Sequence, residues 1–211
     1  MKKQLITALT GGVCLLLGNI TKADTVTLYP VHDAYVQNDE PDSVHNGYSL
    51  SAGYYFGVIT RSYLMFDLSA IPAQSITSAV LRLDTTYLSS TAPVIGAYYL
   101  ENDNWSESTL TWNNAPTNFN LLPADTQLIS YDDIFWTVSD DVSHAYGDDE
   151  IYGVVMKLPN EIPGTKANFW SDETFYTEWS PYLQIGYQPI PEPTSLLLLA
   201  LGGLFLKRHT A

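Results

Sequence analysis

The chain has 211 residues and a formal net charge of −14 at pH 7, which suggests one domain with an acidic surface. Residues 24–190 carry 22 acidic and four basic side chains, a net charge of −18. This charge argues against nucleic acid, anionic lipid and polyanionic sugars as partners, and it favours cations. The single cysteine, Cys14, precedes these residues, so we expect their core to be stable without disulfides.

The first 23 residues have the layout of a secretory signal peptide. Lys2 and Lys3 precede an apolar run over residues 5–17, and the small side chains of Thr21 and Ala23 follow it. This pattern predicts cleavage after Ala23 and export of the mature chain. A membrane anchor is the alternative reading, but the apolar run is too short to cross a bilayer.

Residues 24–190 contain no long stretch with apolar residues at helical spacing. Short aromatic and β-branched segments lie between Gly, Pro, Asn and Asp instead, which is typical of an all-β domain. Residues 61–68 alternate most clearly, with Leu64 and Phe66 on one side and Tyr63 and Met65 on the other. The predicted strands are residues 25–29, 34–37, 50–53, 61–68, 78–84, 94–100, 135–138, 151–158, 167–171 and 182–187.

Two other segments complete the prediction. Val142, Ala145 and Tyr146 share a face at helical spacing, so we expect one or two helical turns there. Residues 118–125 are expected to form a loop. Eight to ten strands in an exported domain favour an antiparallel two-sheet β-sandwich of jelly-roll type with one short helical turn.

Residues 105–116 read WSESTLTWNNAP and place two tryptophans seven residues apart. The Asn and Pro residues at its end predict a turn. Trp105 and Trp112 are either sugar platforms or rings that fix a loop to the sandwich, and we favour the second role. We expect Glu107 to accept hydrogen bonds from backbone or arginine rather than to touch a ligand.

This segment resembles the signature of the DNRLRE-type domains, a family of carbohydrate-binding modules built as β-sandwiches. Residues 61–72, RSYLMFDLSAIP, are similar to a second segment of that family, and the likeness extends over residues 28–187. The resemblance implies sugar binding without enzyme activity. Asp172 stands where the family typically has a basic residue, so a neutral glycan is the expected ligand.

The last residues, 189–211, contain Pro191, Glu192 and Pro193, then an apolar run over residues 196–206, then two basic side chains. A helix of this apolar run is about 16 Å long, roughly half a bilayer core, so it is no self-sufficient anchor. The order resembles the PEP-CTERM sorting signal of Gram-negative bacteria. The resemblance implies processing by an exosortase, with transient membrane contact through residues 196–206 before that step.

Residues 169–182 read FWSDETFYTEWSPY and contain more aromatic rings than strand pairing can bury. Aromatic faces beside a few polar groups are typical of sugar sites, whereas core packing with a mobile loop is the alternative. The candidate carbohydrate-binding residues are Trp170, Glu173, Tyr176, Trp179 and Tyr182.

Acidic loops also supply the carboxylate and carbonyl oxygens that calcium prefers. The densest candidates for a structural Ca²⁺ are Asp39, Glu40 and Asp42 in one loop and Glu101 and Asp103 in another. Neither loop has the spacing of an EF-hand.

The sequence contains no Gly-x-Ser-x-Gly, His-Glu-x-x-His or phosphate-binding glycine loop, and its acidic pairs are typical of solvated loops. We therefore predict a signal peptide (1–23), a sugar-binding sandwich (24–188) and a sorting signal (189–211). The expected function is non-catalytic binding of extracellular polysaccharide at the cell surface or in the matrix. A structural matrix or adhesion protein without sugar specificity is the alternative, and a polysaccharide hydrolase or lyase is a third.

Overall fold

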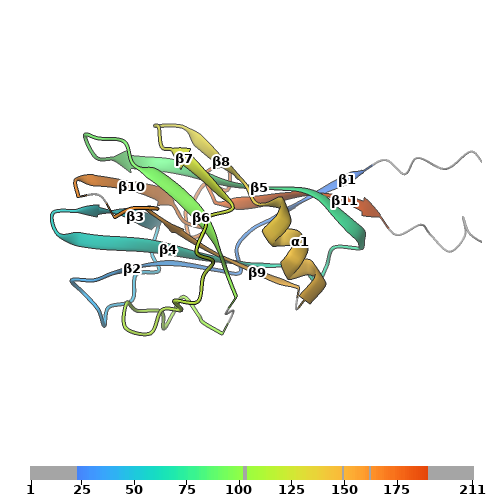
Figure 1. Cartoon of the computed structure of the whole chain (residues 1–211), viewed down its shortest axis with the longest axis horizontal. Helices are drawn as coiled ribbons and strands as arrows, with labels where there is room; N and C mark the ends of the chain where they lie inside the picture. The colour runs from blue at the N-terminus through green and yellow to red at the C-terminus, as the bar shows by residue number, and fades with distance from the viewer. Residues whose placement is uncertain (1–22, 102–103, 149, 162, 190–211) are drawn as a thin grey trace, which may run out of the picture.

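Eleven strands and one helix form in the computed structural model, which describes residues 23–101, 104–148, 150–161 and 163–189 (Figure 1). The curled antiparallel sheet confirms the predicted all-β sandwich. The elements in chain order are β1 (Asp24–Leu28), β2 (His32–Gln37), β3 (Ser49–Tyr55), β4 (Val58–Asp67), β5 (Ala73–Leu88), β6 (Val94–Leu100), β7 (Asp125–Leu128), β8 (Asp133–Thr137), α1 (Ser139–Asp148), β9 (Ile151–Lys157), β10 (Thr165–Trp170) and β11 (Tyr182–Pro189).

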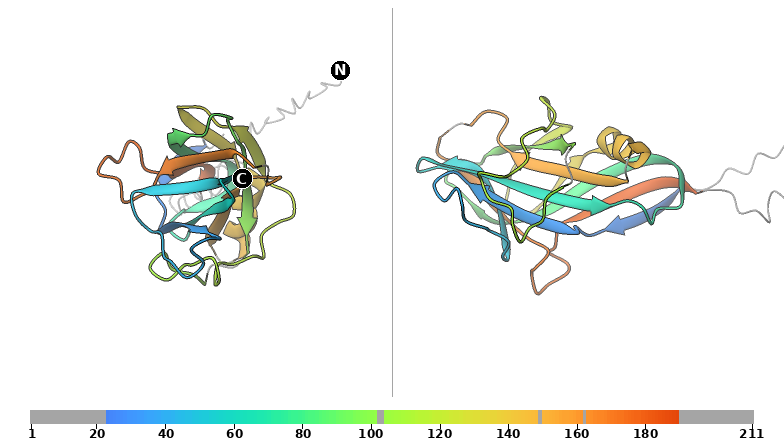
Figure 2. Two further views of the ribbon diagram at one scale, coloured as in Figure 1. Left: turned by 90° about the vertical axis from the view of Figure 1, so that its left-hand side faces the viewer. Right: turned by 90° about the horizontal axis from the view of Figure 1, so that it is seen from below.

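The long strand β5 connects the two layers of the sandwich. Its first part pairs with β11 on one side and β8 on the other, and β1 extends this layer beyond β11. Its last residues pair with β10, which pairs in turn with β3 of the second layer. The second layer continues through β4, β9, β6 and β7, and β2 pairs with β4. The two layers therefore form one curled sheet rather than two separate ones (Figures 1 and 2).

Strand β4 alternates as its sequence predicts. Leu64 and Phe66 are fully buried in the main core between the layers, where the Phe66 ring stacks on that of Tyr152. Tyr63 points to the other face of the sheet and is buried in a second, smaller apolar cluster. Both faces of this strand are thus covered, because a further segment lies over its outer side.

The covering segment is residues 104–119, which contains the two-tryptophan motif. Trp105 and Trp112 pack against the second cluster, and Tyr63 donates a hydrogen bond from its hydroxyl to the Pro116 carbonyl at 3.1 Å. Asn114 closes the turn, because its side chain accepts from the Thr111 N–H and donates to the Thr109 carbonyl. The motif therefore packs a loop onto the sandwich, and the support role favoured for its tryptophans is consistent with this packing.

Three elements differ most from the prediction. Strand β5 runs from Ala73 to Leu88, well beyond the predicted residues 78–84. Helix α1 has 10 residues, nearly three turns rather than one or two, and buries Val142 and Ala145 against the sandwich. Strand β7 forms where the sequence shows no alternation of apolar residues. It is an edge strand whose residues are partly or fully exposed, so it needs no alternating apolar residues.

Strands β1 and β11 place both ends of the described domain at one pole. Asp24 pairs with Tyr187, so the chain enters and leaves side by side, next to the end of the sandwich that carries α1 (Figure 1). Within the described ranges no helix is long and apolar enough to span a bilayer. The predicted signal peptide up to residue 22 and the sorting signal from residue 190, with Pro191, Glu192 and Pro193, lie outside those ranges.

Candidate functional site

The loop between β10 and β11, residues 171–181, carries a compact group of aromatic rings, and we call it the aromatic loop. It stands out from the side of the sandwich in the right-hand view of Figure 2. Trp170, the last residue of β10, stacks on Trp179 with 5.2 Å between centroids and 17° between planes. Tyr176 contacts the Trp179 ring at 4.3 Å and remains 52% exposed. The structure thus brings three of the five predicted sugar-binding residues together.

Tyr182, the fourth predicted residue, makes a different contact at the start of β11. The Arg82 guanidinium lies over its ring at 5.4 Å. Arg82 is almost fully buried, and it donates to the Ser180 carbonyl at 3.1 Å and pairs with Asp84 and Asp133. Burial raises the pKa of the Asp84 carboxyl while the Arg82 charge opposes that rise. Tyr182 and Arg82 therefore hold the end of the aromatic loop on the sheet.

An exposed pair of rings extends the aromatic loop toward a loop that is remote in sequence. Phe175 and Tyr48 lie 5.1 Å apart, and they are 83% and 53% exposed. The sequence around Tyr48 does not mark it as part of this site, because Tyr48 precedes β3 and only the tertiary structure places it beside Phe175. Tyr48, Phe175 and Tyr176 provide exposed ring surface, and the next two residues in the chain, Thr177 and Glu178, are exposed polar side chains.

Glu173, the fifth predicted residue, turns away from these rings and joins a group of carboxylates. One side-chain oxygen each from Asp33, Glu107, Asp172 and Glu173 lies within 4.8 Å of the others, and we call these four residues the acidic cluster. The Glu107 carboxylate accepts from the Asp33 N–H at 3.3 Å, and Asp33 accepts from the Asp172 N–H at 3.0 Å. The backbone hydrogen bond predicted for Glu107 is confirmed.

Burial and crowding disfavour the ionised form of this cluster. Burial raises the pKa of Asp33 to about 9, with a further rise from the nearby charges of Asp172 and Glu173. Burial likewise raises the pKa of Asp172 to about 7, and its hydrogen bond and repulsion with Glu173 add to the effect. A cation placed among the four side chains would instead favour their ionised form.

The residues selected from the sequence as calcium ligands lie elsewhere. Asp39, Glu40, Asp42 and Glu101 are exposed, whereas Asp103 lies outside the described residues. Asp42 accepts a hydrogen bond from the Asn113 side chain at 2.8 Å, and Glu40 lies 3.5 Å from His45. The acidic cluster was missed because its members come from three segments, and only Asp172–Glu173 are adjacent in sequence.

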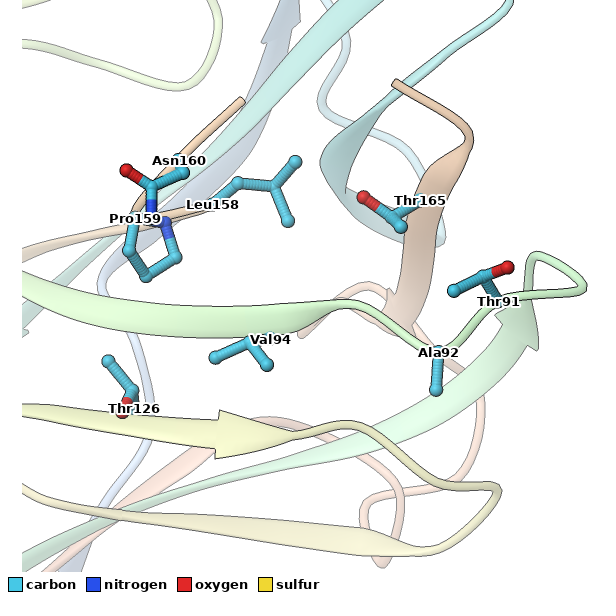
Figure 3. A pocket seen from close by; sticks show the side chains of 8 residues that line it. All are labelled: Thr91, Ala92, Val94, Thr126, Leu158, Pro159, Asn160 and Thr165. Atoms are coloured by element: carbon cyan, nitrogen blue, oxygen red, sulfur yellow. The ribbon is translucent and has the colours of Figure 1, made fainter. Parts of the chain in front are cut away.

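A separate pocket of about 480 Å³ lies beside the start of β6 (Figure 3). Its lining residues are Thr91, Ala92, Val94, Thr126, Leu158, Pro159, Asn160 and Thr165. The lining has neither an aromatic ring nor a charged group, so it lacks the flat stacking face that a sugar ring prefers. The aromatic loop is the better candidate for ligand binding.

A curled β-sandwich that presents aromatic rings beside polar side chains is compatible with a carbohydrate-binding module. The chain belongs to carbohydrate-binding module family 96, whose family model matches residues 24–187. The PEP-CTERM protein-sorting motif matches residues 189–209. These two matches confirm the predicted carbohydrate-binding module and the predicted sorting motif. The sorting motif implies export and association with the cell surface. The DNRLRE name and the signal peptide stay predictions.

A gellan lyase from Bacillus sp is 31% identical to this chain over 115 residues. The matched segment is 53% of this chain but 5% of the lyase, so the chain spans a small part of that enzyme. This likeness does not establish a catalytic activity for the chain.

Proposed function

We propose that this protein is an exported, non-catalytic carbohydrate-binding protein that binds extracellular polysaccharide through its aromatic loop. The observation that carries the proposal is the group formed by Trp170, Trp179 and Tyr176 on the sandwich of a carbohydrate-binding family. Trp179 and Tyr176 supply stacking faces, and Phe175 with Tyr48 lengthens the contact along a polysaccharide chain. Tyr182 supports the end of the loop through its contact with Arg82, which also bonds the Ser180 carbonyl.

A neutral polysaccharide fits this surface better than an acidic one. Residues 169–182 contain no Lys or Arg, and residues 24–190 have a net charge of −18. An acidic polymer would meet repulsion along most of the surface, whereas stacking on a neutral pyranose requires no charge. Glu178 and Thr177, both exposed, can hydrogen-bond to sugar hydroxyl groups beside the rings.

The experiment is a glycan array that contains neutral and acidic polysaccharides, probed with the purified full-length chain. We expect binding to a neutral glycan, lost or weakened in Trp179→Ala and Tyr176→Ala. Tyr131→Ala is the matched control, because Tyr131 is 68% exposed and lies in the loop before β8. Binding to acidic glycans alone would overturn the neutral preference. An absence of glycan binding would favour a structural matrix or adhesion role.

The C-terminal motif carries the second part of the proposal, which is processing by an exosortase at the cell envelope. We expect protein from the surface of its host to lack residues 207–208, together with the apolar run before them. Intact-mass spectrometry of surface material measures this directly. A mature surface species that retains both basic residues would contradict exosortase processing.

A further inference from the structure

The acidic cluster joins three parts of the chain that are distant in sequence. Asp33 lies at the start of β2, Glu107 lies in the two-tryptophan segment, and Asp172 and Glu173 begin the aromatic loop. Hydrogen bonds span 74 residues between Asp33 and Glu107 and 139 residues between Asp33 and Asp172. Four carboxylates therefore meet where two loops cross the edge of the sheet.

Asp33 shows that this group is more than a set of neighbouring acids. Its side chain is fully buried, one carboxylate oxygen accepts from the Asp172 N–H, and the other oxygen, Oδ1, has no hydrogen-bond donor. Oδ1 of Asp172 is also buried without a donor. A buried carboxylate oxygen without a partner is costly, since it has lost its hydration and gained nothing in exchange.

No Lys or Arg side chain of the described residues pairs with the cluster. The four Lys and Arg residues between residues 24 and 190 make contacts elsewhere in the molecule. Arg61 pairs with Glu161, Arg82 pairs with Asp84 and Asp133, Lys157 lies over Tyr98, and Lys166 lies on β10 near Asp39. Among the described residues, His32 contacts the cluster at one acid: its Nδ1 lies 3.7 Å from the Glu107 carboxylate, and its ring lies 5.8 Å from that of Trp105.

The donor set selects the kind of cation. Four carboxylates offer up to eight oxygens and no sulfur, which suits a hard divalent ion rather than zinc or copper. Calcium accepts six to eight oxygens in flexible geometry, whereas magnesium requires a near-ideal octahedron and keeps several waters. Ligands from three separate segments, one of them fully buried, fit the larger and less demanding ion.

We propose that Asp33, Glu107, Asp172 and Glu173 bind one calcium ion, which fixes the aromatic loop and the two-tryptophan segment to strand β2. The ion offsets the mutual repulsion of the four carboxylates and gives Asp33 Oδ1 its missing partner. Calcium binding is then coupled to folding, because the three segments are brought together in the folded state alone.

The test uses the purified full-length chain after treatment with a chelator. Calorimetric titration with calcium chloride should show one site per chain, with a Kd of about 0.1–1 mM if it resembles other extracellular modules. The midpoint temperature of thermal unfolding should rise when calcium is added and fall back to its starting value when chelator is added. Magnesium chloride at the same concentration should produce a much smaller shift.

Three variants in the cluster and one control locate the site. Asp172→Asn and Glu173→Gln keep the side-chain shape and should weaken calcium binding on the order of tenfold or more. Asp42→Asn is the matched control, since Asp42 is an exposed acid in a loop that the sequence alone marked for calcium. Asp33→Asn tests the buried ligand. If the Asp33→Asn chain does not fold, Asp172→Asn and Glu173→Gln still test the site, because these two side chains are half-buried. The proposal is overturned if the unaltered chain shows no calcium site, or if both Asp172→Asn and Glu173→Gln bind as tightly as it does.

Discussion

The indole ring of Trp179 lies almost parallel to that of Trp170, 5.2 Å away, so one of its faces is already covered. The stack fixes Trp179 in one orientation before any ligand arrives, which lowers the entropy lost on binding. Tyr176 contacts the same ring at 51° and keeps half of its surface exposed. The three rings act together, and a change in one alters the support of the others.

The first prediction concerns sugar affinity. Trp179→Ala and Tyr176→Ala should each weaken binding of a neutral glycan about tenfold, or 1–2 kcal/mol, because each removes a stacking face. Isothermal titration calorimetry with a glycan identified on the array is the measurement. Tyr131→Ala should bind normally. If both aromatic-loop variants remain folded with unchanged affinity, the site lies elsewhere, and the region of residues 38–55 around Tyr48 is next to be tested.

The second prediction separates the tryptophans of the sandwich from those of the aromatic loop. Trp105 packs against Tyr63 and the second apolar cluster, so Trp105→Ala should lower the free energy of unfolding by about 2–4 kcal/mol. Glycan affinity of the folded fraction should not change. Urea unfolding followed by fluorescence measures the stability. Leu121→Ala, at a side chain 97% exposed, is the control and should change it by less than about 0.5 kcal/mol. A Trp105→Ala chain with full stability but weaker sugar binding would reverse this assignment.

The third prediction concerns the main core. Phe66 is fully buried and stacked on Tyr152, so Phe66→Ala should destabilise the fold by about 3–5 kcal/mol through the cavity it leaves. Phe56→Ala makes the same chemical change at a ring that is 89% exposed and should have little effect. Comparing the denaturant midpoints of the two variants tests whether the Phe66 side of β4 points into the core. Equal stabilities for these two variants would be incompatible with that orientation.

The fourth prediction uses the close approach of β3 and β10. A Cβ at Gly53 would lie 2.5 Å from the Lys166 Cα and 2.6 Å from the Thr165 carbonyl oxygen, both backbone atoms that cannot move aside. Gly53→Ala should therefore cost about 1–3 kcal/mol by overpacking. At Gly47 a Cβ meets nothing within 4 Å, so Gly47→Ala should be neutral or stabilise by about 0.4–1 kcal/mol. Thermal unfolding of the pair gives the result, and a stable Gly53→Ala chain would show that these strands lie farther apart.

The sequence predicts the strands that bury a face and fails on those that do not. Strand β4 carries alternating residues because Leu64 and Phe66 must reach the core while Tyr63 reaches the second cluster. Strand β7 lies at the sheet edge, where hydrogen bonds to β6 hold it and no face requires apolar residues. Helix α1 is longer than predicted, since its contacts with the core are limited to Val142, Ala145 and Tyr146 and its remaining turns show no apolar pattern.

The two candidate sites also differ in how much of each the sequence predicts. Trp170, Tyr176 and Trp179 lie within ten residues of one another, so a local excess of aromatic rings was enough to select them. Asp33 and Glu107 stand alone in the sequence, and nothing near either residue suggests a cation ligand. They meet Asp172 because β2 pairs with β4 and because the two-tryptophan segment and the aromatic loop both reach β2. None of these contacts is a local property of the sequence. Sites assembled from distant segments require the tertiary structure.

Strand β11 runs directly from the aromatic loop at Tyr182 to Pro189, where the sorting tail follows. A pull between a polysaccharide held at Tyr176 and the chain beyond Pro189 therefore acts along the axis of this strand. Both points of pull lie at the ends of β11, so its covalent backbone carries the tension, while β1 on one side and β5 on the other hold the strand in place. The path that carries load through the protein is thus its most extensively paired terminal strand.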